Sequence, residues 1–138
     1  MKIKRVEHIG IAVDDFAGML RLFRDDLGLD LEYVEELTAL QTRLAMLPAG
    51  ETYIELLEGT SPESLTSRWI AEKGRGLWHI CFEVDDIDSA MQELKAKGVK
   101  LQNDEPMIGH GNSRICFLDP AATGNVLIEL AQLAHDAH

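Results

Sequence analysis

Basic residues and cysteines are scarce in this chain, and each shortage narrows what the protein can do. The net charge is −11, with 13 lysines and arginines against 24 acidic residues. Nucleic acid and anionic membranes are therefore poor partners, since phosphate groups attract stripes of lysine and arginine. The two cysteines, Cys81 and Cys116, each stand in an apolar, strand-like run. We interpret them as buried free thiols of a cytosolic protein, and a disulfide between them is the alternative.

Long hydrophobic runs are also missing. No apolar run approaches the ~18–20 residues that a membrane-spanning helix needs. The start of the chain, residues 1–6, leads directly into a strand rather than into the apolar core of a signal peptide. We therefore expect a cytoplasmic protein without a membrane partner. Hydrophobic residues still make up 46% of the chain, which suits one compact domain, residues 1–138, with a real core.

What the chain does contain is an internal repeat. The stretch VEHIGIAVDDF at residues 6–16 is echoed by LWHICFEVDDI at residues 77–87, with His, Ile, Val, Asp and Asp at the same offsets. A second echo closes each copy, because YIELL around Glu55 matches LIELA around Glu129. The chain therefore reads as two copies of one module, and each copy opens with a strand histidine and closes with a strand glutamate.

Hydrophobic periodicity predicts the order β-α-β-β-β in each module. Module one spans residues 4–58 and module two spans residues 76–132. The expected strands cover residues 5–13, 29–35, 41–47 and 52–58, then 77–84, 99–103, 113–118 and 126–132. The expected helices are capped by Asp14 or Asp15, by Ser61 and by Asp86, and they end at Gly28, near Lys73 and at Gly98. The helix over residues 61–73 connects the modules, and residues 105–112 form a loop.

The matched histidines and glutamates suggest a metal site. A carboxylate between Ile54 and Leu56 is costly to bury unless it is paired or bound to a metal. Two imidazoles and two carboxylates converging from equivalent strands would offer two nitrogen and two oxygen ligands. This donor set suits a borderline or hard divalent ion held octahedrally with two open positions. Duplication could also copy these residues without any function.

These residues carry a family resemblance. The chain resembles the vicinal oxygen chelate (glyoxalase/bleomycin resistance/dioxygenase) superfamily and, within it, the methylmalonyl-CoA epimerases. The matching segments are residues 6–13, 52–58, 69–73, 76–80, 108–112 and 124–130. The last two segments, together with the insert at residues 121–124, favour the epimerases over glyoxalase I.

The resemblance implies an α+β fold in which two tandem βαβββ modules form a half-open barrel around a metal. It assigns His8, Glu55, His79 and Glu129 as metal ligands, and Glu129 also as the base that removes the C2 proton of methylmalonyl-CoA. The cofactor would be a divalent ion, with cobalt, manganese, nickel, zinc and magnesium all compatible with the ligands. The partner would be an acyl-CoA substrate, and a homodimer is expected.

Four positions depart from the family pattern or remain open. Trp78 precedes the ligand His79 where the family commonly has a second histidine. Arg43 stands where some epimerases carry a carboxylate proposed as a second base, so we hypothesise that it binds the substrate; an exposed strand arginine is the alternative. Gly109 and Gly111 would let the backbone approach the substrate closely, or they form an ordinary hairpin turn.

The nearest alternative function is that of a glyoxalase I-like lactoylglutathione lyase, or of another metal-dependent isomerase or lyase in the superfamily. It would use the same four ligands and the same proton abstraction on a glutathione adduct. A non-enzymatic, drug-sequestering member would generally lack the full ligand set. An extradiol dioxygenase would hold iron by two histidines and one carboxylate, and the fourth ligand disfavours it.

Overall fold

The computed structural model describes residues 1–134, which fall into two compact units. One unit is His8–Trp78, and the other combines Met1–Glu7 with the chain from His79 onward. Strand β1 (Ile3–Ala12) contributes to both units, and so does β5 (Gly76–Val84).

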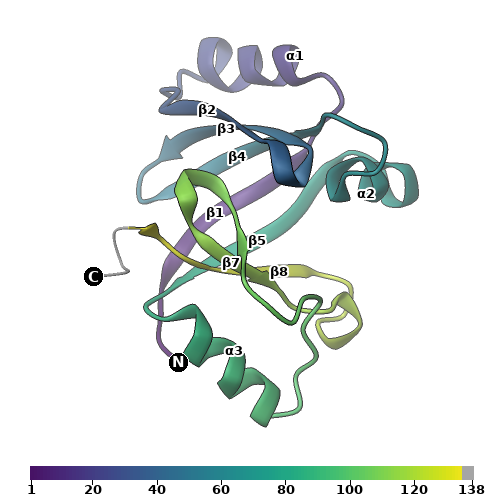
Figure 1. The fold of residues 1–138 in the computed structure, drawn as a ribbon. Helices are drawn as coiled ribbons and strands as arrows, with labels where there is room; N and C mark the ends of the chain where they lie inside the picture. The colour runs from purple at the N-terminus through teal and green to yellow at the C-terminus, as the bar shows by residue number, and fades with distance from the viewer. Residues whose placement is uncertain (135–138) are drawn as a thin grey trace. The chain divides into compact units, whose positions relative to one another are not determined.

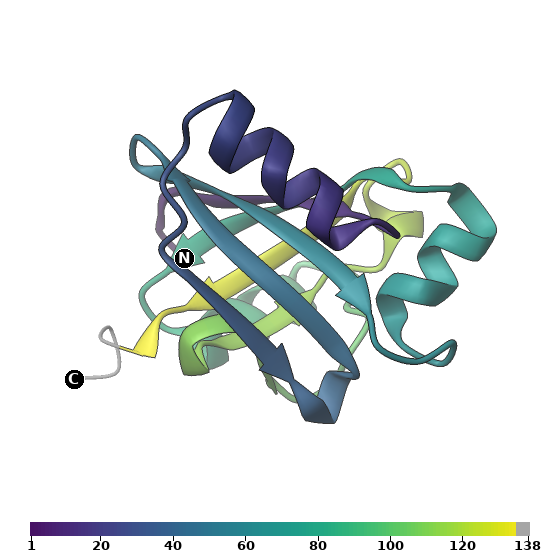
Figure 2. The same cartoon turned by 90° about the horizontal axis from the view of Figure 1, so that it is seen from above.

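In the unit His8–Trp78, helix α1 lies across one face of the β-sheet (Figures 1 and 2). The strands have the order β2-β3-β4-β1, and β1 is parallel to β4 while the other neighbours are antiparallel. Asp15 caps α1 as predicted, because its side chain accepts a hydrogen bond of 3.0 Å from the backbone N–H of Gly18. The elements of this unit besides β1 are α1 (Phe16–Arg21), the π-helical turn η1 (Leu22–Asp26), β2 (Tyr33–Leu37), η2 (Thr38–Leu40), β3 (Thr42–Ala49), β4 (Thr52–Gly59) and α2 (Leu65–Lys73).

The core of this unit lies between α1 and the sheet. It is built from the α1 side of β3 and β4 and from the residues that lead into the helix: Val13, Phe16, Ala45, Leu47 and Leu56. Because residues alternate between faces along a strand, the other face of the same strands presents Leu44, Met46, Glu55 and Leu57. The polar Glu55 is thus on the face that α1 does not cover.

The other unit repeats this plan around α3 (Ile87–Ala96). Its sheet runs from the first half of β1 through β5, β8 and β7 to β6, and β5 is parallel to β8. Asp86 caps α3 as predicted, with a hydrogen bond of 3.1 Å from the N–H of Ser89. The apolar side of α3, with Ile87, Ala90 and Met91, forms one core cluster with residues outside the helix: Val84, Cys116, Leu118 and Leu130. The remaining elements are β6 (Met107–Ile108), η3 (His110–Asn112), β7 (Arg114–Phe117), η4 (Pro120–Ala122) and β8 (Leu127–Gln132).

The predicted α+β class and the β-α-β-β-β order of each half are confirmed. The predicted strand over residues 99–103 is wrong, because Leu101 makes only an isolated bridge to Leu118. Val99 and Leu101 instead pack against the core cluster that includes α3. The alternating apolar residues therefore reflect burial and not hydrogen bonding to a neighbouring strand. The second strand of this half is instead β6, which lies inside the predicted loop 105–112.

The connecting helix begins later than predicted. Ser64, not Ser61, is its N-cap, and the Ser64 Oγ accepts a hydrogen bond of 3.0 Å from the N–H of Ser67. Ser61 instead accepts a hydrogen bond from the N–H of Glu63, two residues further on, which holds a turn rather than a helix. The prediction chose the wrong serine because Pro62 is also typical of a first helical position.

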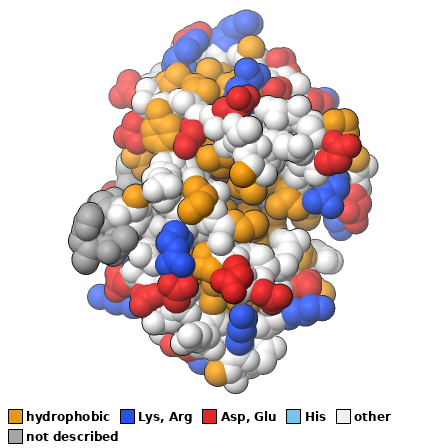
Figure 3. Space-filling view, viewed as in Figure 1, with side chains coloured by type: hydrophobic (Ala, Val, Ile, Leu, Met, Phe, Trp, Pro, Cys, Tyr) orange, Lys and Arg blue, Asp and Glu red, His pale blue; other side chains and the backbone are white. Residues whose placement is uncertain are grey.

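The distribution of surface charge and the state of the cysteines agree with what the composition predicts. On the face shown in Figure 3, lysines and arginines lie in separate places rather than in one stripe. Cys81 and Cys116 are both buried and free, so the free-thiol interpretation is confirmed. Within residues 1–134, no helix combines the length and apolarity needed to cross a membrane.

Candidate functional site

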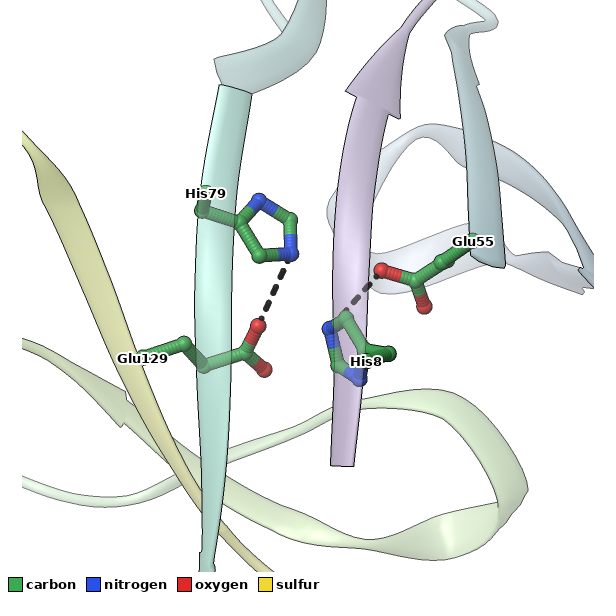
Figure 4. A group of neighbouring side chains, drawn as sticks. All are labelled: His8, Glu55, His79 and Glu129. Carbon is green, nitrogen blue, oxygen red and sulfur yellow. Dashed lines mark ion pairs between the residues drawn. The ribbon is translucent and has the colours of Figure 1, made fainter. Parts of the chain in front are cut away.

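The first His–Glu pair lies in the unit His8–Trp78, on neighbouring parallel strands. In the β1–β4 register, Gly10 is the partner of Glu55, and His8 stands two residues before Gly10 on the same face. The His8 Nε2 atom lies 3.1 Å from the Glu55 Oε1 atom (Figure 4). The two side chains are 1% and 4% exposed, so this pair is held away from water.

The second pair reproduces the first in the other unit. In the β5–β8 register, Cys81 is the partner of Glu129, and His79 stands two residues before Cys81. The His79 Nε2 atom lies 3.0 Å from the Glu129 Oε1 atom, and the side chains are 2% and 4% exposed (Figure 4). The ring of Phe117 contacts that of His79 edge-on, with 5.8 Å between centroids. The duplication seen in the sequence thus extends to the contact between the side chains.

Each pair fits metal ligation in donor chemistry and in spacing. Taking an ionised carboxylate out of water costs several kcal/mol unless a cation or a hydrogen bond compensates. Metal–ligand bonds of about 2.1 Å at right angles place adjacent ligand atoms about 3.0 Å apart. The N···O separations match this value, which is also the length of an ordinary hydrogen bond. All four residues are buried, and each offers one ligand atom. Each pair can therefore supply one nitrogen and one oxygen to a divalent cation.

Arg43 does not agree with the substrate-binding role predicted for it. Arg43 pairs across the sheet with Glu58. Glu58 stands three residues beyond Glu55 on β4, so Glu58 and Arg43 lie on the opposite face of the strands from Glu55. Its guanidinium carbon is 4.4 Å from the centroid of the Phe16 ring, and its Nη2 donates a hydrogen bond of 2.8 Å to Glu58. Arg43 therefore joins the start of α1 to β4. Gln41, two residues before Arg43, has φ 51° and precedes β3, so strand alternation does not extend to it.

Two glycines in the loop before β7 have local structural reasons to be glycine. A Cβ at Gly109 would lie 2.9 Å from Ile115 Cγ2 and 3.0 Å from Ser113 Oγ. Gly111 adopts φ 58°, the left-handed region that favours glycine. These constraints account for the loop shape, and they leave the predicted contact with the substrate as a proposal.

A buried pair that joins the same loop to β1 was not predicted from the sequence. His110 Nε2 lies 2.7 Å from Glu7 Oε1, and both side chains are buried, at 7% and 1% exposure. This contact ties the loop to β1. The repeat gave no signal for it, because the residue equivalent to Glu7 in the second copy is Trp78. Trp78 instead packs against Trp69, with 6.3 Å between ring centroids.

Comparison with known proteins gives consistent matches over most of the chain. The family model described as the Glyoxalase/Bleomycin resistance protein/Dioxygenase superfamily matches residues 7–117. The mitochondrial methylmalonyl-CoA epimerase of Mus musculus is 33% identical over 132 residues, covering 95% of this chain and 74% of that protein.

Solved structures extend the match to the fold. One is a Streptomyces coelicolor methylmalonyl-CoA epimerase variant in complex with 2-nitronate-propionyl-CoA, 34% identical with a TM-score of 0.91 and 96% of both chains covered. A methylmalonyl-CoA epimerase in complex with methylmalonyl-CoA and NH4+ has the same identity, TM-score and coverage.

Proposed function

Because the chain belongs to the glyoxalase/bleomycin resistance protein/dioxygenase superfamily, we propose that it is a metal-dependent epimerase of methylmalonyl-CoA. The observation that carries the proposal is the pair of equivalent His–Glu contacts, 3.1 Å and 3.0 Å long, on parallel strands of the two units. The choice of substrate is supported by relatives that carry the epimerase name and match at 33–34% identity.

In the proposed mechanism, His8, Glu55, His79 and Glu129 together hold one divalent cation. When bound, such a cation would supply Lewis-acid stabilisation for the negative charge that develops on the thioester oxygen of the substrate. The four residues supply two nitrogen and two oxygen donors, which several divalent ions accept, so the donor set alone selects no single metal. Glu55 and Glu129 are both anionic ligands, and the second negative ligand lowers the net charge of the loaded site.

Glu129 is proposed as the base. The C2 proton of methylmalonyl-CoA lies between two carbonyl groups, and a positioned carboxylate can remove it. The C2–H bond breaks, the proton goes to Glu129, and the electron pair enters an enolate of the thioester. Return of a proton to the opposite face of C2 gives the other epimer. We propose that the backbone at Gly109 and Gly111 contacts the substrate and that Arg43 does not.

A direct assay tests this function against its nearest alternative. Purified protein loaded with a divalent ion is given one C2 epimer of methylmalonyl-CoA and, separately, the hemithioacetal of methylglyoxal and glutathione. The proposal predicts conversion of the CoA ester to its epimer and no lactoylglutathione. Turnover of the hemithioacetal alone would instead establish a glyoxalase I-like lyase. A protein inactive on both would point to binding without catalysis.

A homodimer and a cytoplasmic location remain predictions. Light scattering of the purified protein would test the first, and fractionation of the source cells would test the second.

A further inference from the structure

Epimerisation at C2 requires a second proton carrier in addition to Glu129. One group removes a proton from one face of C2, and another must supply a proton to the opposite face. Arg43 cannot act as this group, because a guanidinium stays protonated at working pH and because the residue lies on the α1 face. A second proton carrier must therefore be another acidic side chain near the proposed site.

Within the unit His8–Trp78, the strand register shows which carboxylate shares a face with the first His–Glu pair. Glu35 in β2 is the partner of Leu44 in β3, and Leu44 is the partner of Leu57 in β4. Leu57 stands two residues beyond Glu55 and so shares its face. Glu35 therefore lies on the same face of the sheet as the pair His8 and Glu55.

The other strand carboxylates of this unit do not share that face. Strands β2, β3 and β4, with residues 8–12 of β1, carry four glutamates. Glu36 and Glu58 both pair with Arg43, which puts them on the α1 face. Glu32 precedes β2, is exposed, and accepts a hydrogen bond of 2.8 Å from the Tyr53 hydroxyl. Besides Glu55, Glu35 is thus the strand carboxylate of this unit that shares the face of the first His–Glu pair.

The spacing suits a small acyl group. Glu35 is two strands and two residues away from Glu55 in the register. Strands about 4.8 Å apart that rise about 3.3 Å per residue place these two Cα atoms about 12 Å apart. Both glutamate side chains project from the same face, so the gap between the carboxylates admits a few carbon atoms. Glu35 is partly buried and its neighbour Leu44 is fully buried, so water is partly excluded on this side.

We propose that Glu35 is the second acid–base residue of the reaction, an inference that rests on the proposed function. Starting with Glu129 ionised and Glu35 protonated, Glu129 accepts the C2 proton and the C2–H electron pair enters the enolate. The enolate then takes the proton of the Glu35 carboxylic acid at C2 from the opposite face. The products are the other epimer, protonated Glu129 and ionised Glu35. Proton exchange with water restores the starting state, and the reverse reaction uses the same groups with their roles exchanged.

The test combines stereochemistry with isotope exchange. Each single epimer of methylmalonyl-CoA is incubated in D2O with metal-loaded wild-type protein and with the variants Glu35→Gln, Glu36→Gln and Glu32→Gln. Epimer composition and C2 deuterium content are followed together, and bound metal is measured in every sample. Glu36→Gln is the matched control, because it makes the same chemical change one residue further along β2, on the other face of the sheet.

Loss of one proton carrier has a distinct signature. In Glu35→Gln, interconversion falls by about 100-fold or more, the usual contribution of a general acid or base. Deuterium still enters one epimer without inversion, because Glu129 continues to exchange the proton on its own face. Glu36→Gln and Glu32→Gln stay within about twofold of wild type, as expected for residues outside the reaction.

Four results would overturn the assignment. Normal interconversion in Glu35→Gln would show that the residue carries no proton, and so would a comparable loss in Glu36→Gln. Loss of exchange from both epimers in Glu35→Gln, with metal retained, would show a role in binding rather than in protonation. A wild-type protein inactive on both epimers would defeat the proposed function and this inference with it, whereas active wild type with unaffected Glu35→Gln defeats only the inference.

Discussion

At the scale of single residues, strand parity separates side chains that the sequence places close together. Arg43 and Leu44 are adjacent, yet Arg43 contacts Phe16 and Glu58 on the α1 face while Leu44 is fully buried on the face of Glu55. A shift of one position in alignment exchanges these two environments. This is why a family pattern assigned to position 43 suggested a substrate contact that the structure does not support.

Arg43→Ala is expected to affect stability rather than substrate binding. It removes a cation–π contact with Phe16 and an ion pair with Glu58, each worth roughly 0.5–1 kcal/mol at partly exposed sites. We expect a loss of about 1 kcal/mol in urea unfolding, with KM and kcat changed by less than about twofold. Arg43→Lys should lie between the two proteins, since lysine keeps the charge but loses the planar guanidinium. An increase in KM without loss of stability would restore the substrate-binding hypothesis.

Cys116 gives a prediction about pH. Burial in the core cluster, with a smaller effect from the Glu129 carboxylate, raises the pKa of this thiol to about 12 from a usual value of 9.0. Folding thus favours the neutral thiol. The stabilisation is fully present below the unfolded pKa and is lost as the pH rises toward the folded pKa.

The free energy of unfolding should therefore fall more steeply with pH in the wild type than in Cys116→Ala. We expect the two curves to differ in slope above about pH 9, by on the order of 1–2 kcal/mol at about pH 11. Denaturation measured in urea at several pH values provides the test. Parallel curves would mean that the thiol titrates normally in the folded protein.

At the scale of helices and strands, the sequence predicted the helix caps better than it predicted which segments pair in the sheet. Asp15 and Asp86 were recognised as helix caps because each directly precedes an apolar helical pattern, and both caps are confirmed. The strand at residues 99–103 was wrong because alternation reports burial and cannot show whether a neighbouring strand is available for pairing. The two-residue β6 was missed because so short an element has no periodicity of its own.

The cap of α2 can be tested by comparing two serines. Ser64 is 3% exposed, and its hydroxyl accepts the N–H of Ser67. Ser64→Ala should lower the free energy of unfolding by about 1 kcal/mol, as cap losses usually do. The matched change Ser61→Ala should cost clearly less, since Ser61 caps no helix and its hydroxyl bonds only to Gln41 and Glu63 at an exposed turn. Urea unfolding distinguishes them, and a larger loss for Ser61→Ala would return the helix start to the residue predicted from the sequence.

At the scale of the whole molecule, duplication was the strongest signal in the sequence. It located His8, Glu55, His79 and Glu129 before any fold was known, because matched residues at matched offsets imply matched places in two modules. The structure confirms the equivalence within each unit, down to register and contact length. Features that break the symmetry had no such signal, and the buried pair of Glu7 and His110 was therefore missed.

We propose that the two His–Glu pairs, one from each half of the chain, act together on one metal ion. Metal content of the desalted, ion-loaded protein tests it most directly, with folding checked by circular dichroism. We predict one bound ion per chain in the wild type and in the control Glu63→Gln, which changes an exposed carboxylate. His8→Ala and His79→Ala should each lose the ion, since a missing ligand in either half destroys the shared site. Two ions in the wild type, or one ion retained in either histidine variant, would contradict the account.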